Sequence, residues 1–374
     1  MTLFICFIGN LYRMTQYIIV LGAFIVSALC GFISIPAIQK YCKDKNLYDI
    51  PNQRKVHHCL VPRLGGISFL PSMVVAFIIA LLLLGNQAQA RKVEINLWSL
   101  YFMVSLLIIY TTGIIDDIIG LSANIKFVMQ IVAASILPLA GLYINNLYGL
   151  FGFYEIPYYI GCPLTVFTIV FIDNAMNLID GIDGLCASLS LMALTGFLFC
   201  FWREGLFIYC VLIAGLMGVL IPYLYHNIFG TTEKGNKIFM GDSGSLTLGF
   251  ILGFLFVKFV MDNRQVMPFC EDRMCMAFSL IIIPVFDVVR VICYRLIHHK
   301  PIFDADKNHI HHKLMATGMN QHKALLTILG LALGFICLNF LMYNLTNITI
   351  ILLADIAIYT LFNILVNLNI KKKK

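Results

Sequence analysis

The sequence predicts an all-α polytopic integral membrane protein with about eleven transmembrane helices, an outside N-terminus and a cytoplasmic C-terminus. Of its 374 residues, 60% are hydrophobic and 12% are charged, against about 25% charged in ordinary soluble domains. Apolar runs recur along the whole chain, and Lys and Arg gather in alternate loops. We see no separate soluble domain and no repeat at a fixed period, so residues 1–374 are expected to form one transmembrane domain with its core at 17–369.

A helix that crosses the hydrocarbon core needs roughly 17–25 predominantly apolar residues. Eleven runs meet this requirement, near 17–38, 64–84, 97–115, 124–143, 159–178, 185–202, 205–225, 244–261, 275–296, 322–343 and 347–369. The first run is interpreted as a retained span, because no small-residue cleavage site of a signal peptide follows it. An odd number of spans predicts termini on opposite sides of the membrane.

The basic residues predict the orientation. Of the 26 Lys and Arg residues, 19 fall in loops on the side of 40–63 and in the C-terminal KKKK, 6 fall on the opposite side, and Lys258 lies within a span. Cytoplasmic loops carry the excess of Lys and Arg. The first side is therefore expected to be cytoplasmic.

Two other readings of the composition are disfavoured. The net charge of +7 does not form a basic face interleaved with aromatics, so nucleic acid is not an expected partner. The twelve Cys residues are scattered singly, mostly in apolar runs, which is not the pattern of a disulfide framework.

Polar segments gather on the predicted cytoplasmic side, in loops 40–66, 116–126, 173–185, 226–245 and 296–322. The segment FIDNAMNLIDGIDGL contains Asn174, Asn177, Asp180 and Asp183. Asn174 and Asn177 are one helical turn apart and can face one ligand. Oxygen-rich groups beside glycine suit a hard cation such as Mg²⁺ and the phosphates that it holds. The alternative is a polar helix cap followed by a turn.

Two further clusters fit the same chemistry. Asp116 and Asp117 follow an apolar run, where carboxylates are costly unless they are paired, hydrated or metal-bound. Lys126 begins the next run and can act as a point charge for phosphate. Asp242 lies between glycines before another span, so it is a candidate metal ligand beside an anion-binding helix N-terminus. A solvated helix end remains the alternative for Asp116 and Asp117, and a helix entry built of small residues remains the alternative for the Asp242 segment.

The loop PIFDADKNHIHHKL brings together His309, His311 and His312. A histidine cluster suggests zinc, but the pattern is not H-E-x-x-H. Imidazoles and lysines also suit phosphate or a nucleobase, and a structural loop stays open. Asp287 and Arg290 are one turn apart and are interpreted as a neutralised pair within a span.

At this point the residues resemble a known family. The segments VHHCLVPRLGG, GIIDDIIGLSANIK, NAMNLIDGIDGL, FMGDSGSL and DADKNHIHHKL occur in this order. They closely resemble the polyprenyl-phosphate N-acetylhexosamine-1-phosphate transferases, in particular the bacterial undecaprenyl-phosphate GlcNAc-1-phosphate transferases. The related phospho-MurNAc-pentapeptide transferase usually has a Thr-Pro-Thr-Met-Gly-Gly type stretch where this chain has residues 61–66. That departure argues against the peptidoglycan enzyme, which stays an alternative.

The resemblance implies a function and roles for the candidate residues. The enzyme would move a sugar-1-phosphate from a UDP-sugar to polyprenyl phosphate in the cytoplasmic membrane of a bacterium. It would need Mg²⁺, with Mn²⁺ as a substitute ion, and a homodimer is an open alternative. The implied metal ligands are Asn177 and Asp242; the catalytic candidates are Asp116, Asp117, Asp180 and Asp183; the substrate-binding candidates are Arg63, Lys126, Asn174, His309, His311 and His312. A secondary transporter and a membrane zinc hydrolase are the alternatives from other classes.

Overall fold

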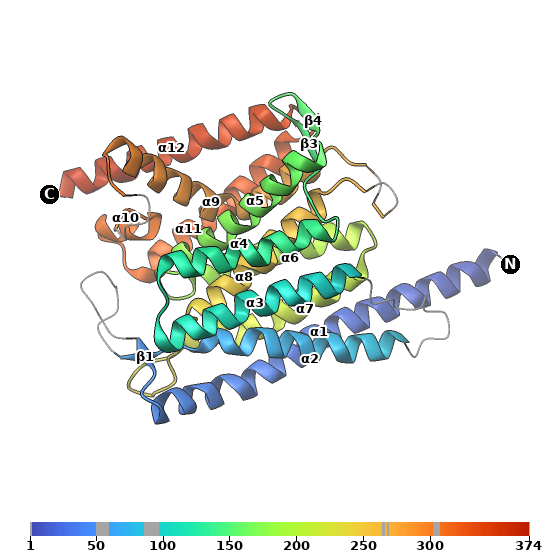
Figure 1. The fold of residues 1–374 in the computed structure, drawn as a ribbon, viewed down its shortest axis with the longest axis horizontal. Helices are drawn as coiled ribbons and strands as arrows, with labels where there is room; N and C mark the ends of the chain where they lie inside the picture. The colour runs from blue at the N-terminus through green and yellow to red at the C-terminus, as the bar shows by residue number, and fades with distance from the viewer. Residues whose placement is uncertain are drawn as a thin grey trace.

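The computed structural model describes residues 2–49, 60–85, 97–263, 266–267, 269–301 and 307–373. Parts of the predicted site loops 40–66 and 296–322 therefore lie outside the described residues. In the described part the chain is almost entirely helical (Figure 1). The helices are α1 (Thr2–Asp44), α2 (Phe69–Gly85), α3 (Leu97–Ile119), α4 (Ala123–Leu139), α5 (Tyr158–Ile179), α6 (Leu185–Arg203), α7 (Phe207–Leu224), α8 (Asp242–Val260), α9 (Arg273–Ile297), α10 (Ile310–Ala316), α11 (Gln321–Met342) and α12 (Ile348–Lys373).

Ten of the described helices are long and apolar enough to cross a membrane, so the class of polytopic membrane protein is confirmed. The predicted count of eleven is one higher, because the run at 124–143 forms α4, a shorter helix of 17 residues. α4 ends at Leu139, where the backbone N–H groups of Gly141 and Leu142 bond back to the carbonyls of Pro138 and Leu137. This pair of bonds is the Schellman arrangement that closes a helix.

The short breaks between predicted spans are confirmed. α5 ends at Ile179 and α6 begins at Leu185, while α6 ends at Arg203 and α7 begins at Phe207. The sequence did not predict several small elements. These are the antiparallel pair β1 (Tyr48–Asp49) and β2 (Val61–Pro62), the 3-10 turn η1 (Gly65–Ser68), the antiparallel hairpin β3 (Asn146–Leu150) and β4 (Phe153–Glu155), the π-helical turn η2 (Tyr225–Phe229) and α10.

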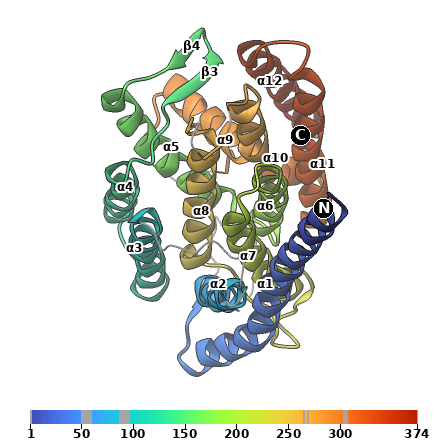
Figure 2. The ribbon, with the colours of Figure 1, turned by 90° about the vertical axis from the view of Figure 1, so that its right-hand side faces the viewer.

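The centre of the bundle is α8. All of its residues after Asp242 are buried, and it packs against α3 and α5 on one side and against α6 and α9 on the other (Figure 2). A helix that is apolar all round is expected at such a position. α4 packs beside α3 and α5. The first turn of α8, which bears Asp242, is thereby placed among the ends of α3, α4 and α5.

Candidate active site

A single cavity of about 1710 Å³ opens among these helix ends. All twelve site residues predicted from the sequence line it: Arg63, Asp116, Asp117, Lys126, Asn174, Asn177, Asp180, Asp183, Asp242, His309, His311 and His312. They come from α3, α4, α5, α8, α10 and the loops that join the helices. Residues up to 249 positions apart in sequence, from Arg63 to His312, therefore share one site.

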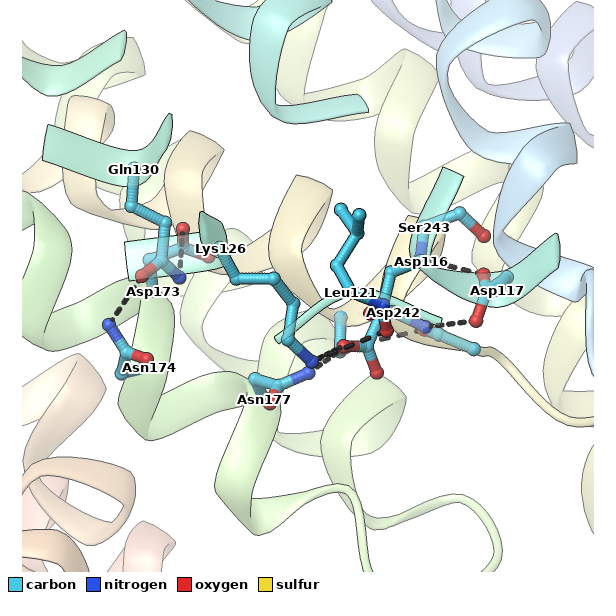
Figure 3. Close-up of polar contacts among 12 residues, drawn as sticks. Asp116, Asp117, Leu121, Lys126, Gln130, Asp173, Asn174, Asn177, Asp242 and Ser243 are labelled. Atoms are coloured by element: carbon cyan, nitrogen blue, oxygen red, sulfur yellow. Dashed lines mark hydrogen bonds and ion pairs between the residues drawn. The ribbon is translucent and has the colours of Figure 1, made fainter. Parts of the chain in front are cut away.

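Lys126 connects two carboxylates at the centre of the cavity (Figure 3). Its Nζ lies 2.7 Å from Asp242 Oδ2 and 3.3 Å from Asp116 Oδ2. The other oxygen of Asp116 accepts the backbone N–H of Leu121 at 2.7 Å. Both oxygens of Asp116 thus accept a hydrogen bond. The ammonium of Lys126 lies between the carboxylates of Asp116 and Asp242, where a metal cation could also bind.

Asp117 is bound differently from its neighbour. Its Oδ1 and Oδ2 accept the backbone N–H groups of Asp242 and Ser243, at 2.8 and 2.9 Å. These are among the N–H groups that a helix leaves without intrahelical partners at its start, so Asp117 holds the N-terminus of α8. The carboxylate of Asp117 packs closely against Gly241, whose φ is +74°. A Cβ on Gly241 would lie 2.4 Å from Asp117 Oδ2.

Asn177 joins α5 to the same helix end. Its amide donates to Ser245 Oγ at 2.8 Å, which places the side chain over the first turn of α8. Ligand atoms of Asp116, Asp117 and Asp242 all lie within 4.8 Å of one another. Carboxylate and amide oxygens at this spacing fit a hard divalent cation such as Mg²⁺. In the described part of the chain, these three carboxylates are the group of His, Cys, Asp or Glu side chains whose ligand atoms lie close enough together to hold a metal ion.

A second polar layer lies beside the first along α4 and α5 (Figure 3). Gln130 follows Lys126 by one helical turn and donates to Asp173 Oδ2 at 3.0 Å. The carbonyl oxygen of Gln130 accepts the amide of Asn174 at 2.9 Å. Asn174, a predicted substrate-binding residue, is therefore held by a neighbour that the sequence did not single out.

The turn between α5 and α6 positions Asp180 and Asp183. Asp180 ends α5, and burial together with the nearby carboxylates of Asp242 and Asp183 raises the pKa of Asp180 to about 7. Asp183 forms an ion pair with Lys237 at 2.6 Å, and the same ammonium donates to the carbonyl of Asn227 at 2.6 Å. This pair ties the turn to the segment that precedes Asp242.

The three histidines also line the cavity. His311 is 1% exposed, and its ring lies against the α5–α6 turn, because a Cβ on Gly181 would overlap it at 2.1 Å. Burial, and then the neighbouring His312, lowers the pKa of His311 to about 3. His309 Nδ1 lies 2.8 Å from Asp287 Oδ2. The predicted Asp287–Arg290 pair is present at 2.7 Å, but Asp287 also anchors the histidine loop.

Arg63 reaches the cavity from the segment between β2 and η1. That segment is fixed by backbone bonds to the strand-like stretch before α8: Phe239 N–H to the Pro62 carbonyl, and Gly65 and Gly66 N–H to the carbonyls of Phe239 and Met240. The turn before the second span, a weak signal in the sequence, is therefore part of the wall around Asp242.

One wall of the cavity is apolar. It is formed by side chains of α4, α5 and α9: Phe127, Ile131, Pro163, Val166, Phe167, Val170, Phe171, Val288, Val289 and Ile292. This wall begins beside Lys126 and Asn174 and continues along α5 and α9, two helices of membrane-spanning length. A ligand with an anionic head and a long hydrocarbon chain would match both parts.

Known proteins resemble this chain over most of its length. Residues 99–260 match the model of Glycosyl transferase family 4. The chain is 31% identical over 328 residues to a protein of Bacillus subtilis (strain 168) named "Probable undecaprenyl-phosphate N-acetylglucosaminyl 1-phosphate transferase", an alignment that covers 84% of this chain and 82% of that protein.

Two further relatives bear the name undecaprenyl-phosphate alpha-N-acetylglucosaminyl 1-phosphate transferase. The protein of Yersinia pestis is 30% identical over 286 residues, which cover 75% of this chain and 73% of the relative. The protein of Escherichia coli (strain K12) is 29% identical over 294 residues, which cover 78% and 75%. The chain therefore belongs to glycosyl transferase family 4, as a membrane enzyme of the sugar-1-phosphate transferase class.

Proposed function

We propose that this enzyme transfers an N-acetylhexosamine-1-phosphate, GlcNAc-1-phosphate first among the candidates, from its UDP-sugar to undecaprenyl or another polyprenyl phosphate, releasing UMP. The reaction would be the first membrane step of a surface polysaccharide pathway in the cytoplasmic membrane of a bacterium. The observation that carries the proposal is the joining, in one cavity, of the Asp116–Lys126–Asp242 cluster with the apolar wall of α4, α5 and α9. The names of the relatives support the choice of sugar.

Asn177 and Asp242 are the residues proposed to hold Mg²⁺, with Asp116 beside them. When bound, the ion supplies charge stabilisation to the two phosphates that meet in the transition state. Lys126 is well placed to exchange its carboxylate partners for a phosphate oxygen, because its ammonium already lies inside the cavity. Arg63 and the three histidines would bind the nucleotide sugar.

The proposed reaction is a direct displacement. An oxygen of the lipid phosphate attacks the phosphorus that bears the sugar, and the bond from that phosphorus to the oxygen of UMP breaks. A phosphate monoester has a second pKa of about 6, so the acceptor is already mostly dianionic at neutral pH and needs little help from a base. The partners of Asp116 and Asp117 support this route, since both oxygens of each carboxylate already accept a donor.

The test of substrate is UMP release by purified enzyme with Mg²⁺, polyprenyl phosphate and a panel of UDP-sugars. We expect UDP-GlcNAc to be used, and omission of the lipid to abolish release. UDP-MurNAc-pentapeptide belongs in the panel as the alternative donor, and its use in place of UDP-GlcNAc would assign the enzyme to peptidoglycan synthesis. UMP release with no sugar of the panel would contradict the proposed function.

For the metal, we predict that Asp242→Asn lowers turnover at least about 100-fold, because loss of a metal's carboxylate forfeits several kcal/mol of transition-state stabilisation. Asn177→Ala should lose turnover too, but raised Mg²⁺ should partly restore it, since a neutral ligand contributes less than a carboxylate. The measurement is UMP release against Mg²⁺ concentration. Asp355→Asn is the matched control, a buried carboxylate in α12 that lies outside the cavity lining. Near-normal activity of Asp242→Asn at ordinary Mg²⁺ would remove it from the metal site.

A further inference from the structure

Asp287 is the hydrogen-bond partner that holds His309 and Ile310 in place. It lies in α9 with 0% of its surface exposed. Its Oδ1 accepts from Arg290 at 2.7 Å, from the backbone N–H of Ile310 at 2.9 Å and from the hydroxyl of Tyr359 at 3.4 Å. Its Oδ2 lies 2.8 Å from His309 Nδ1. A carboxylate that only neutralised Arg290 would not need the other three partners.

The contact with Asp287 determines which ring nitrogen of His309 bears hydrogen. An ionised carboxylate only accepts hydrogen bonds, so Nδ1 of His309 must be the donor. The Arg290 guanidinium already balances the charge of Asp287. In the neutral imidazole whose Nδ1 is the donor, Nε2 is the acceptor nitrogen.

Neighbouring contacts hold the ring in place. Arg290 donates to the carbonyl of Asn308, and Asp287 accepts the N–H of Ile310. The residues on both sides of His309 are thus bound to the same two side chains of α9. His309 is 6% exposed and lines the cavity. With Nδ1 bound to Asp287, Nε2 is the ring nitrogen left for a ligand there.

We propose that Asp287 is a positioning residue that makes His309 Nε2 a hydrogen-bond acceptor for an N–H or O–H group of the nucleotide sugar. The assignment rests on the proposed function, because it places the nucleotide sugar on the histidine side of the cavity. It goes beyond that function in giving one histidine a fixed tautomer and a fixed direction of hydrogen bonding. A purely structural anchor at Asp287 is the competing account.

The first experiment leaves Asp287 intact and compares His309→Gln with His309→Asn. The Gln amide reaches about as far as Nε2 of the imidazole and can present a carbonyl oxygen to the ligand. The Asn amide reaches only as far as Nδ1, so it can keep the bond to Asp287 but not the contact with the ligand. We expect the Asn variant to raise the KM for UDP-sugar at least about tenfold above that of the Gln variant, in keeping with an unsatisfied polar group. The reverse order would overturn the proposal.

The second experiment is a double-mutant cycle. In Asp287→Asn, the amide oxygen can still accept from Arg290 and Ile310, while the amide N–H₂ faces His309 Nδ1 and forces the ring proton to Nε2. A change of this kind beside a histidine is known to act through the tautomer with the geometry kept. We expect the KM for UDP-sugar to rise at least about tenfold, with the KM for polyprenyl phosphate unchanged.

The cycle separates positioning from folding. With His309→Gln already present, Asp287→Asn should have little further effect on the KM for UDP-sugar, because no ring remains to be oriented. Tyr359→Phe, which removes only the longest bond to Asp287, is the control and should behave as wild type. If Asp287→Asn caused the same loss whether or not His309→Gln was present, the proposal would be contradicted.

UMP release by the wild-type enzyme distinguishes a failure of the role proposed for Asp287 from a failure of the proposed function. Wild-type turnover of UDP-sugar with failure of the predicted variant order would refute the role of Asp287 and leave the proposed function standing. If Asp287→Asn does not fold, the Gln and Asn variants of His309 still decide the question.

Discussion

The carboxylates of Asp116 and Asp117 have separate tasks, although both lie near the end of α3. Asp117 binds the first N–H groups of α8, and Asp116 binds Lys126 and the N–H of Leu121. Loss of Asp117 should therefore displace the helix that bears Asp242, whereas loss of Asp116 removes a charge beside Lys126. The two residues would both be essential for different physical reasons.

His311 should make the histidine loop sensitive to acid. The pKa of His311 is lowered to about 3 from the usual 6.5, first by burial and then by His312. Below pH 6.5 the released loop takes up a proton that the packed loop cannot. Stability therefore rises with pH between about 3 and 6.5 and is level above that range. At pH 5 the loss amounts to about 2 kcal/mol, at 1.36 kcal/mol for each pH unit.

The measurement for His311 is hydrogen exchange of the backbone of Ile310–Ala316, corrected for the intrinsic effect of pH. We expect the opening constant of this segment to increase about 30-fold from pH 7 to pH 5 in the wild type, and much less in His311→Gln. His322→Gln is the control, because His322 is exposed at the start of α11. An unchanged acid response in His311→Gln would show that another group is responsible.

Residue types beside glycine, at span ends and in the histidine-containing loop predicted most of the polar side chains that line the cavity, and the family resemblance added Arg63. Their partners were not predictable. Gln130, Lys237 and Asp287 act through contacts with Asp173, Asp183 and His309, which depend on how distant helices pack. The i, i+4 spacing of Lys126 and Gln130 was the signal in the sequence that could have found one of them.

At the scale of elements, α8 owes its central position to small residues. A Cβ on Gly249 would lie 2.7 Å from Asp173 Cα and from Asp173 Oδ1, and a Cβ on Gly253 would lie 3.2 Å from Ile169 Cα. Glycines four residues apart let two transmembrane helices approach closely. The contact joins α8 to α5 next to the Gln130–Asp173–Asn174 layer.

We predict that Gly249→Ala destabilises the protein by about 1–3 kcal/mol, because the overlap is with backbone that cannot rotate away. Gly330→Ala is the matched control. Gly330 and Gly334 have the same spacing in α11, but a Cβ on either meets no atom within 4 Å. The thermal midpoint of each purified variant gives the comparison. Equal midpoints for Gly249→Ala and the control would show that the α5–α8 contact adapts.

Long apolar elements were predictable because their length is set by the bilayer. The ends of α5, α6 and α7 agree with the predicted breaks, since charged or glycine-rich residues interrupt the apolar runs there. The shortness of α4 and the β3–β4 hairpin were not foreseen. A run of apolar residues does not reveal whether its last residues belong to a helix or to the following turn.

At the scale of the whole molecule, the site lies at one end of the bundle. Figure 1 shows α10, β1 and the C-terminus at that end and the N-terminus at the other. Ten of the described helices have spanning length, and α4 packs against α3 and α5 as a shorter helix. A site at a helix end lets a water-soluble donor and a lipid acceptor reach the same carboxylates from different sides.

The last prediction concerns which end faces the cytoplasm. Lys and Arg are retained on the cytoplasmic side during insertion, and the sequence assigns 19 of the 26 to the predicted loops and tail on the side of 40–63. A phosphatase that is active only in the periplasm serves as the reporter. Fused after Lys374 it should stay in the cytoplasm and be inactive, whereas fused after Gly205, in the turn between α6 and α7, it should reach the periplasm and be active. Because a nucleotide sugar is made in the cytoplasm, an active fusion after Lys374 with an inactive one after Gly205 would refute both the orientation and the access of the donor to the site.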